Sequence, residues 1–206
     1  MPVYETTNES FYKGYPINTG YRNQFSCYTL TLDYIIDRVE YMTHHHSKVM
    51  CCRIDIHLPS YMRADICKPT TRILESLSRT LRVQAEMRDK KNKFEMHYVW
   101  CSERNTSENE QVHCLLLFNG NVNESGFHVW EESKKIVKRI FSTDNDGLVQ
   151  RDDFEYIDKN NRKTKRCELM IDRNSYYYND KLALAIYAAS YLAKTTYAHN
   201  RVEGEG

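Results

Sequence analysis

The stretch from Gln111 to Phe118 constrains the fold more than any other part of the sequence. It reads QVHCLLLF, and after His113 its side chains are apolar at odd and even positions alike. Because successive side chains of a strand point to opposite faces, a strand of this kind is apolar on both faces. We therefore expect a central strand with a protein layer on each side of it.

A second strand is expected at residues 49–58, which alternate between an apolar face and a polar face. The polar face carries Arg53, Asp55 and His57. A polar connection over residues 104–110 indicates that the central strand forms a hairpin with the strand before it. The remaining strands are expected at residues 94–103 and 168–172, and helices at residues 29–43, 70–87, 127–141 and 181–194.

The expected elements follow the order strand–helix–strand–strand–helix–strand, with one more helix at each end. This order predicts an α+β protein with an antiparallel sheet and the split βαβ core of ferredoxin-like folds. In that core both internal helices cover one face, and the first and third strands are neighbours. The other face would carry Asp55, His57 and His113, with the C-terminal tyrosine-bearing helix across or beside it.

Composition supports a single folded domain. The 206 residues are 41% hydrophobic and 28% charged, which is typical of globular proteins. We expect an extended N-terminal arm at residues 1–24, one domain at 25–198 and a disordered tail at 199–206. The tyrosines of the arm either stack on bases or pack on the domain. Because no apolar run approaches the roughly 18 residues that cross a bilayer and no signal-peptide pattern is present, we expect a cytoplasmic protein without membrane contact.

Charge and cysteine usage exclude two classes of protein. Seven cysteines without a C-x-x-C pair argue against a zinc ribbon and a disulfide framework. A net charge of +1 argues against a general nucleic-acid coat protein. A local basic patch remains, because residues 159–166 hold five cations and no acid. They either form a solvated loop or contact backbone phosphates through Lys159, Arg162, Lys163, Lys165 and Arg166.

The helix expected at residues 181–194 carries candidate catalytic side chains on one side. Its sequence KLALAIYAASYLAK places an apolar stripe on one face and Tyr187, Tyr191 and Lys194 on the opposite side. A tyrosine hydroxyl beside an ammonium group suits nucleophilic attack on a phosphate. The structural alternative is a half-buried helix whose tyrosines pack against the sheet, with a lysine that the helix dipole favours.

A metal site is the second candidate. If the hairpin pairs Glu103 with Gln111, then Glu103, Gln111 and His113 share one face. A carboxylate, an amide oxygen and an imidazole can hold Mg²⁺ or Mn²⁺, which would polarise a phosphodiester. The alternative is that His113 is a strand residue whose polar groups are satisfied within the protein.

Four segments in this order, VMCCRIDIHLP, YVWCSER, QVHCLLLFNG and SYLAKT, resemble the YagK/YfjJ family of prophage proteins over residues 25–197. That family is similar to the replication proteins of filamentous phages and to HUH endonucleases, which start rolling-circle replication. The resemblance implies a Rep-like domain that nicks single-stranded DNA or an origin hairpin and works with host replication proteins.

The resemblance also implies residue roles. The His-hydrophobic-His motif of the family falls on residues 111–113, and the tyrosine motif on residues 191–194. Tyr191 would be the nucleophile, Tyr187 the second tyrosine of a two-tyrosine site, and Glu103 an acidic metal ligand. Gln111 departs from the motif, because it replaces the first histidine. Two further readings are a nucleic-acid-binding or regulatory protein without catalysis, and an interaction module that binds no nucleic acid.

Overall fold

The computed structural model describes residues 4–59, 61, 65–88, 92–104, 110–157, 163–196 and 199–201. Its larger elements are α1 (Thr29–His45), β5 (Lys48–Leu58), α2 (Cys67–Arg88), β6 (Met96–Arg104), β7 (Glu110–Asn119), α3 (Gly126–Phe141), β11 (Glu168–Asp172) and α4 (Tyr178–Ser190). The predicted α+β class with an antiparallel sheet is confirmed. Among the described residues, no helix combines the length and the apolar character that a membrane span requires.

The main sheet has the order β11-β5-β7-β6-β12, and β8 (Val149–Asp152) pairs with the second half of β5. All of its pairings are antiparallel. β5 and β7 are neighbours, as expected for the first and third strands of the core. β7 lies between β5 and β6 and is buried at every position except Gln111. The prediction of a central strand is therefore confirmed.

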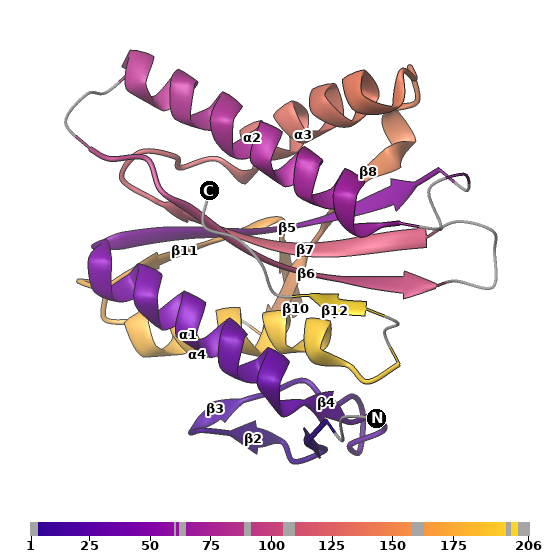
Figure 1. Cartoon of the computed structure of the whole chain (residues 1–206). Coiled ribbons are helices and arrows are strands. Elements are labelled where there is room, and N and C mark those ends of the chain that lie inside the picture. The colour runs from indigo at the N-terminus through magenta and orange to yellow at the C-terminus, as the bar shows by residue number, and fades with distance from the viewer. Residues whose placement is uncertain are drawn as a thin grey trace.

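Helices cover both faces of this sheet (Figure 1). α2 and α3 lie on one face, and we call it the α2/α3 side. α1 and α4 lie on the other, the α1/α4 side. Each side has its own apolar core: Phe118, Trp100 and Leu77 belong to the first, whereas Leu115 and Ile186 belong to the second.

The N-terminal segment is folded, so the expectation of an extended arm is wrong. β2 (Phe11–Tyr12) and β3 (Tyr15–Pro16) form a hairpin, and β1 (Thr6–Thr7) pairs with β4 (Cys27–Tyr28). The two hairpin turn residues, Lys13 and Gly14, have φ angles of 48° and 84°, as the tightest hairpin turns require. The hairpin lies beyond α1 and α4 in Figure 1 and buries Ile17.

Three further differences concern short elements. β9 (Phe154–Ile157) and β10 (Lys163–Arg166) form a separate hairpin, which the sequence patterns did not indicate. β12 (His199–Arg201) pairs with β6, so three residues of the expected disordered tail form a strand. Residues 202–206 lie outside the described part of the chain. All seven cysteines are free thiols.

Candidate active site

Four polar side chains gather on the α1/α4 side, where β5, β7 and β6 lie next to one another. We call this group, formed by Asp55, Glu103, Gln111 and His113, the polar cluster. Backbone pairing sets its arrangement, since Asp55 lies opposite His113 and Glu103 lies opposite Gln111. The condition that Glu103 pairs with Gln111 is therefore met, and this pairing places both residues on one face with His113.

Asp55 holds the polar cluster together with both of its carboxylate oxygens. His113 Nδ1 lies 2.8 Å from Asp55 Oδ1, and Gln111 Nε2 donates to Asp55 Oδ2 at 3.0 Å. On the other edge of the imidazole ring, His113 Nε2 lies 3.4 Å from Glu103 Oε2. One imidazole therefore stands between two carboxylates, and Asp55 fixes the orientation of its ring.

The two carboxylates change the acidity of His113. Burial by itself lowers the pKa of His113, but the hydrogen bonds and charges of Asp55 and Glu103 outweigh burial and raise this pKa above its ordinary value. A protonated His113 can donate a hydrogen bond to a phosphate oxygen, whereas a neutral His113 can bind a metal ion. The site therefore supports either role, depending on pH and on what is bound.

An ion pair borders the polar cluster on β5. Arg53 is buried and pairs with Asp152 of β8. Burial raises the pKa of Asp152, an effect that Arg53 opposes and Asp55 reinforces. Next to Gln111 lies His57, whose buried Nε2 has no hydrogen-bond partner among the described residues. A buried ring nitrogen of this kind is costly unless something else uses it.

His113 and Glu103 fit two ligands of one hard cation. Two ligands at right angles, each about 2.1 Å from a Mg²⁺ ion, are about 3 Å apart. This separation is close to the 3.4 Å between His113 Nε2 and Glu103 Oε2. Gln111 fits less directly, because its amide nitrogen is directed at Asp55. Within the described ranges, no three His, Cys, Asp or Glu side chains form a metal-binding group.

The tyrosines expected on one helix lie on two different elements. α4 begins at Tyr178 and ends at Ser190, and the 3-10 turn η3 (Tyr191–Ala193) follows it. The Ser190 hydroxyl donates to the backbone oxygen of Tyr187 and accepts the backbone N–H of Asn18, both at 2.7 Å. These bonds to a side chain accompany the end of the helix. The predicted helix over residues 181–194 is therefore wrong at both boundaries.

Tyr191 is half-buried beside an aromatic ring and an ammonium group. Its ring meets that of Phe25 edge to face at 5.9 Å, and Lys194 Nζ lies 5.3 Å from the centre of the Tyr191 ring. The N-terminal segment fixes this region, because the Thr195 N–H donates to the backbone oxygen of Ser26 at 2.9 Å. Tyr187 is more open, with 39% of its surface exposed.

The tyrosine end of the chain and the polar cluster lie on the same side of the sheet. Tyr191 packs against the apolar core of the α1/α4 side, which includes Cys101, and η3 contacts β6. On β6, Cys101 lies directly opposite His113. In Figure 1 the C-terminal ends of α4, β5 and β6 point to the same end of the molecule. Tyr191 and Lys194 therefore lie on the same side of the main sheet as His113 and towards the same end of it.

The basic segment is only partly described. Lys165 and Arg166 are exposed at the end of β10, and Lys163 lies at the start of the same strand. Lys159 and Arg162 lie outside the described residues. The hairpin of β9 and β10 contacts α4 through β9. The structure therefore places two exposed cations near the tyrosine-bearing helix and leaves a phosphate contact as a prediction.

Sequence reasoning missed two roles in this site. Asp55 was expected on the correct face but without a partner, and it is the residue that joins Gln111 to His113. Asp152 was not assigned to any strand. The available signal was the alternation of Arg53, Asp55 and His57, because three ionisable side chains on one face of a buried strand require partners.

These features define a class: an α+β protein whose antiparallel sheet is covered by helices on both sides and carries a histidine–carboxylate site at one end. The chain belongs to the YagK/YfjJ family, because the model of the YagK/YfjJ C-terminal domain matches residues 7–204. The match includes the N-terminal hairpin, the polar cluster and the turn with Tyr191. No curated protein and no solved structure matches the chain.

Proposed function

We propose that this protein nicks single-stranded DNA to start replication of a prophage, through attack of Tyr191 on a phosphodiester. One observation carries the proposal. His113, oriented by Asp55 and facing Glu103, lies on the same side and at the same end of the sheet as Tyr191 and Lys194. The motif resemblance to HUH endonucleases points in the same direction, and such a role would place the protein in the cytoplasm.

In the proposed step, the oxygen of Tyr191 forms a bond to phosphorus and the bond from phosphorus to the 3′ oxygen breaks. The phenol loses a proton and the departing 3′ oxygen gains one, so that the products are a 5′-phosphotyrosine and a free 3′ hydroxyl. Lys194 would support the step, because its ammonium lies 5.3 Å from the centre of the Tyr191 ring and a cation there would stabilise the negative charge that develops on the phenol.

His113 and Glu103 would hold a Mg²⁺ or Mn²⁺ ion, with Gln111 Oε1 as a third ligand. When bound, such an ion supplies Lewis-acid polarisation of the phosphodiester. Asp55 acts on the orientation of His113, and its removal would leave the imidazole without its fixed ring position. Lys165 and Arg166 would contact phosphates of the strand outside the reacting group.

The proposal is tested by the covalent product. Wild-type protein is incubated with a panel of single-stranded and hairpin oligonucleotides in Mn²⁺ and in Mg²⁺, and adducts are detected by denaturing electrophoresis and mass spectrometry. We expect an adduct on Tyr191 that Tyr191→Phe abolishes and that His113→Ala reduces by at least about 100-fold, because losing even a group that only orients a metal ligand costs about 10- to 100-fold.

Tyr187→Phe is the matched control, because Tyr187 lies one turn away on α4. If Tyr191 acts alone in the first cleavage, Tyr187→Phe keeps the adduct. An adduct that survives Tyr191→Phe but not Tyr187→Phe would assign the attack to Tyr187. Absence of any adduct with wild-type protein across the whole panel would reject the nicking function.

A second candidate is a protein that binds single-stranded nucleic acid without cutting it. The observation in its favour is the hydrogen bond from Gln111 Nε2 to Asp55, which directs the amide at a carboxylate. Isothermal titration with Mn²⁺ separates the two candidates. If wild-type protein binds no Mn²⁺ and Gln111→His creates binding, the non-catalytic function is favoured. If wild-type protein binds Mn²⁺ and His113→Ala removes it, the nicking function is favoured.

A further inference from the structure

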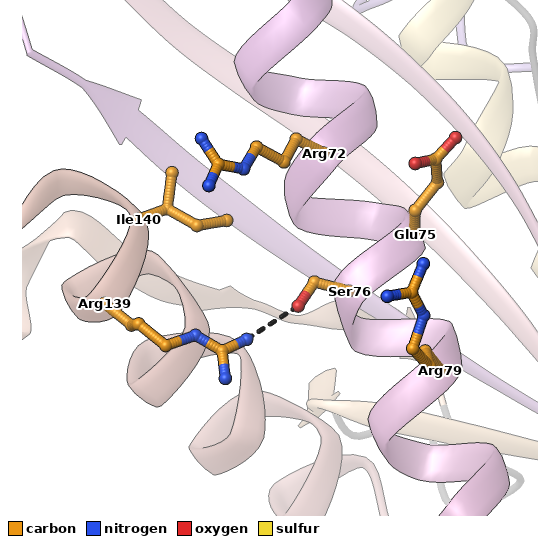
Figure 2. A pocket seen from close by; sticks show the side chains of 6 residues that line it. All are labelled: Arg72, Glu75, Ser76, Arg79, Arg139 and Ile140. Atoms are coloured by element: carbon orange, nitrogen blue, oxygen red, sulfur yellow. Dashed lines mark hydrogen bonds between the residues drawn. The ribbon is translucent and has the colours of Figure 1, made fainter.

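The outer surface of the α2/α3 side holds a pocket between its two helices (Figure 2). Arg72, Ser76 and Arg79 line it from α2, and Arg139 and Ile140 line it from α3. Arg139 Nη2 donates to Ser76 Oγ at 2.8 Å, which ties the two helices together across the pocket. We call the pocket, with its three arginines, the arginine groove. It lies on the opposite side of the sheet from the polar cluster.

The charge of the arginine groove is not neutralised. Glu75 is the one acidic residue that lines it, against three arginines, and all four are exposed. Within the described ranges, Arg72, Arg79 and Arg139 have no ion-pair partner. The lysines of α3 differ, because Lys134, Lys135 and Lys138 pair with Glu131, Glu132 and Asp146. The lysines of α3 are therefore paired with acidic residues of the protein, whereas the three arginines are available to an external anion.

The spacing of these arginines fits a polymer better than one small anion. Arg72 and Arg79 are separated by two helical turns, about 10.5 Å along the axis. That length corresponds to about three nucleotide steps measured along the axis of a duplex, where each strand rises 3.4 Å per step. Figure 2 shows the side chains of Arg72 and Arg139 between the two helices, and the guanidinium group of Arg79 further along α2 beside Glu75. A row of phosphates can contact all three in turn.

The lining also indicates the form of nucleic acid. Sites for single strands combine cations with aromatic side chains on which bases stack. The arginine groove has no aromatic residue in its lining: beside the arginines and Glu75, it offers one serine and one isoleucine. Such a surface has groups for phosphates and none for unpaired bases, so it suits a duplex, whose bases are turned inward.

We propose that the arginine groove binds the phosphate backbone of double-stranded nucleic acid without sequence preference. This contact is separate from the proposed reaction at Tyr191, since it lies on the other side of the sheet and needs no metal ion. It would hold duplex next to a strand that is opened on the α1/α4 side. The inference concerns equilibrium binding, so it stands or falls independently of covalent adduct formation.

The test measures the affinity of the full chain for a labelled mixed-sequence DNA duplex from 50 to 200 mM salt. Each phosphate contact contributes about 0.9 to the slope of log K against log salt. The triple variant Arg72→Ala, Arg79→Ala, Arg139→Ala is expected to lose about 2.7 from that slope. Over this fourfold rise in salt, wild-type affinity should therefore fall about 40-fold more than that of the triple variant.

Lys135→Ala is the matched control, because Lys135 is an exposed cation on the same helix as Arg139 and is already paired with Glu132 at 2.7 Å. It should leave the slope unchanged, whereas Arg139→Ala lowers it by about 0.9. Circular dichroism and thermal unfolding check that every variant is folded. A triple variant with the wild-type slope, or Lys135→Ala with the same loss as Arg139→Ala, would overturn the proposal.

Four unlabelled competitors identify the ligand: a DNA duplex, an RNA duplex, a single strand and poly-glutamate. Displacement of the labelled duplex by unlabelled DNA or RNA duplex supports the backbone contact, and the stronger competitor identifies the natural duplex. Stronger displacement by an unpaired strand, which the triple variant weakens equally, would reject the duplex in favour of single strands. Displacement by poly-glutamate at the same charge concentration would show that acidic protein, and not a phosphate backbone, fits the groove.

Discussion

The two sides of the sheet differ along the length of the same strands. On the α2/α3 side, β5 is apolar from its third residue to its last, with Met50, Cys52, Ile54, Ile56 and Leu58. On the α1/α4 side, β5 begins with apolar Val49 and Cys51 and then changes to Arg53, Asp55 and His57. β7 shows the same change, from Leu117 and Leu115 to His113 and Gln111.

This difference separates the residues that hold the fold from those available for chemistry. Burying polar groups costs free energy unless each one finds a partner. The α1/α4 side meets that cost with paired groups at both ends: Asp55 satisfies Gln111 and His113, and Asp152 satisfies Arg53. At the other end of β6, the buried His97 lies 3.0 Å from Glu95 Oε1. Departures from an apolar core of this kind are expected at functional sites.

The largest expected effect lies on the apolar α2/α3 side. Phe118→Ala removes a fully buried ring that contacts Phe94, so the free energy of unfolding should fall by about 3–5 kcal/mol. Urea denaturation measures this change. The control is Phe127→Ala, because Phe127 is 52% exposed, and it should cost less than about 1 kcal/mol. Equal losses in the two variants would contradict the description of this side as the structural core.

A smaller effect is expected at the polar end. Asp55→Ala removes the carboxylate that His113 and Gln111 both contact, so the free energy of unfolding should fall by about 1–3 kcal/mol. The same denaturation experiment applies. Asp37→Ala, which removes an exposed carboxylate from α1, should change stability by less than about 0.5 kcal/mol. If Asp55→Ala leaves the free energy of unfolding unchanged or raises it, the hydrogen bonds of the polar cluster do not stabilise the folded protein.

The smallest expected effect is a pH dependence. His113 has a raised pKa in the folded protein, so the folded state binds more protons than the unfolded chain between the two pKa values. The stability that this gives is fully present below the unfolded pKa of about 6.5 and is lost as pH rises through the folded pKa. Denaturation curves from pH 5.5 upward should therefore show His113 contributing less at higher pH.

His113→Gln provides the control for this pH dependence, because glutamine does not titrate. The decrease in stability with rising pH should be weaker in His113→Gln than in wild type, when each is compared with its own value at low pH. Parallel pH curves for the two proteins would mean that His113 has no raised pKa and that the carboxylates on either side of it do not hold its proton.

Sequence patterns were sufficient to predict the long helices and strands and the face of β5 that carries the site. The double-sided apolar pattern of QVHCLLLF identified the central strand, and the alternation at 49–58 placed Arg53, Asp55 and His57 on the correct face. These predictions succeeded because burial on one face imposes a period of two on a strand. The shared face of Glu103, Gln111 and His113 depended on the register of the hairpin, which the alternation does not contain and which the structure supplies.

Other features depend on contacts between distant parts of the chain, which a pattern does not contain. The end of α4 at Ser190 accompanies a hydrogen bond from Asn18, and the bond between Asp55 and His113 joins residues 58 positions apart. The folded N-terminal hairpin was missed because residues 1–24 show no period. Its turn residues, Lys13 and Gly14, were the available local signal.

The contact between Asn18 and Ser190 also bears on the order of folding. It joins residues separated by 172 positions, so closing it costs more chain entropy than forming any single helix or hairpin. We expect the sheet and α2 to form while the turn at Tyr191 is still unsettled. The tyrosine end would then be among the last parts to assemble, which would delay any reactivity of Tyr191 until the rest of the chain has folded.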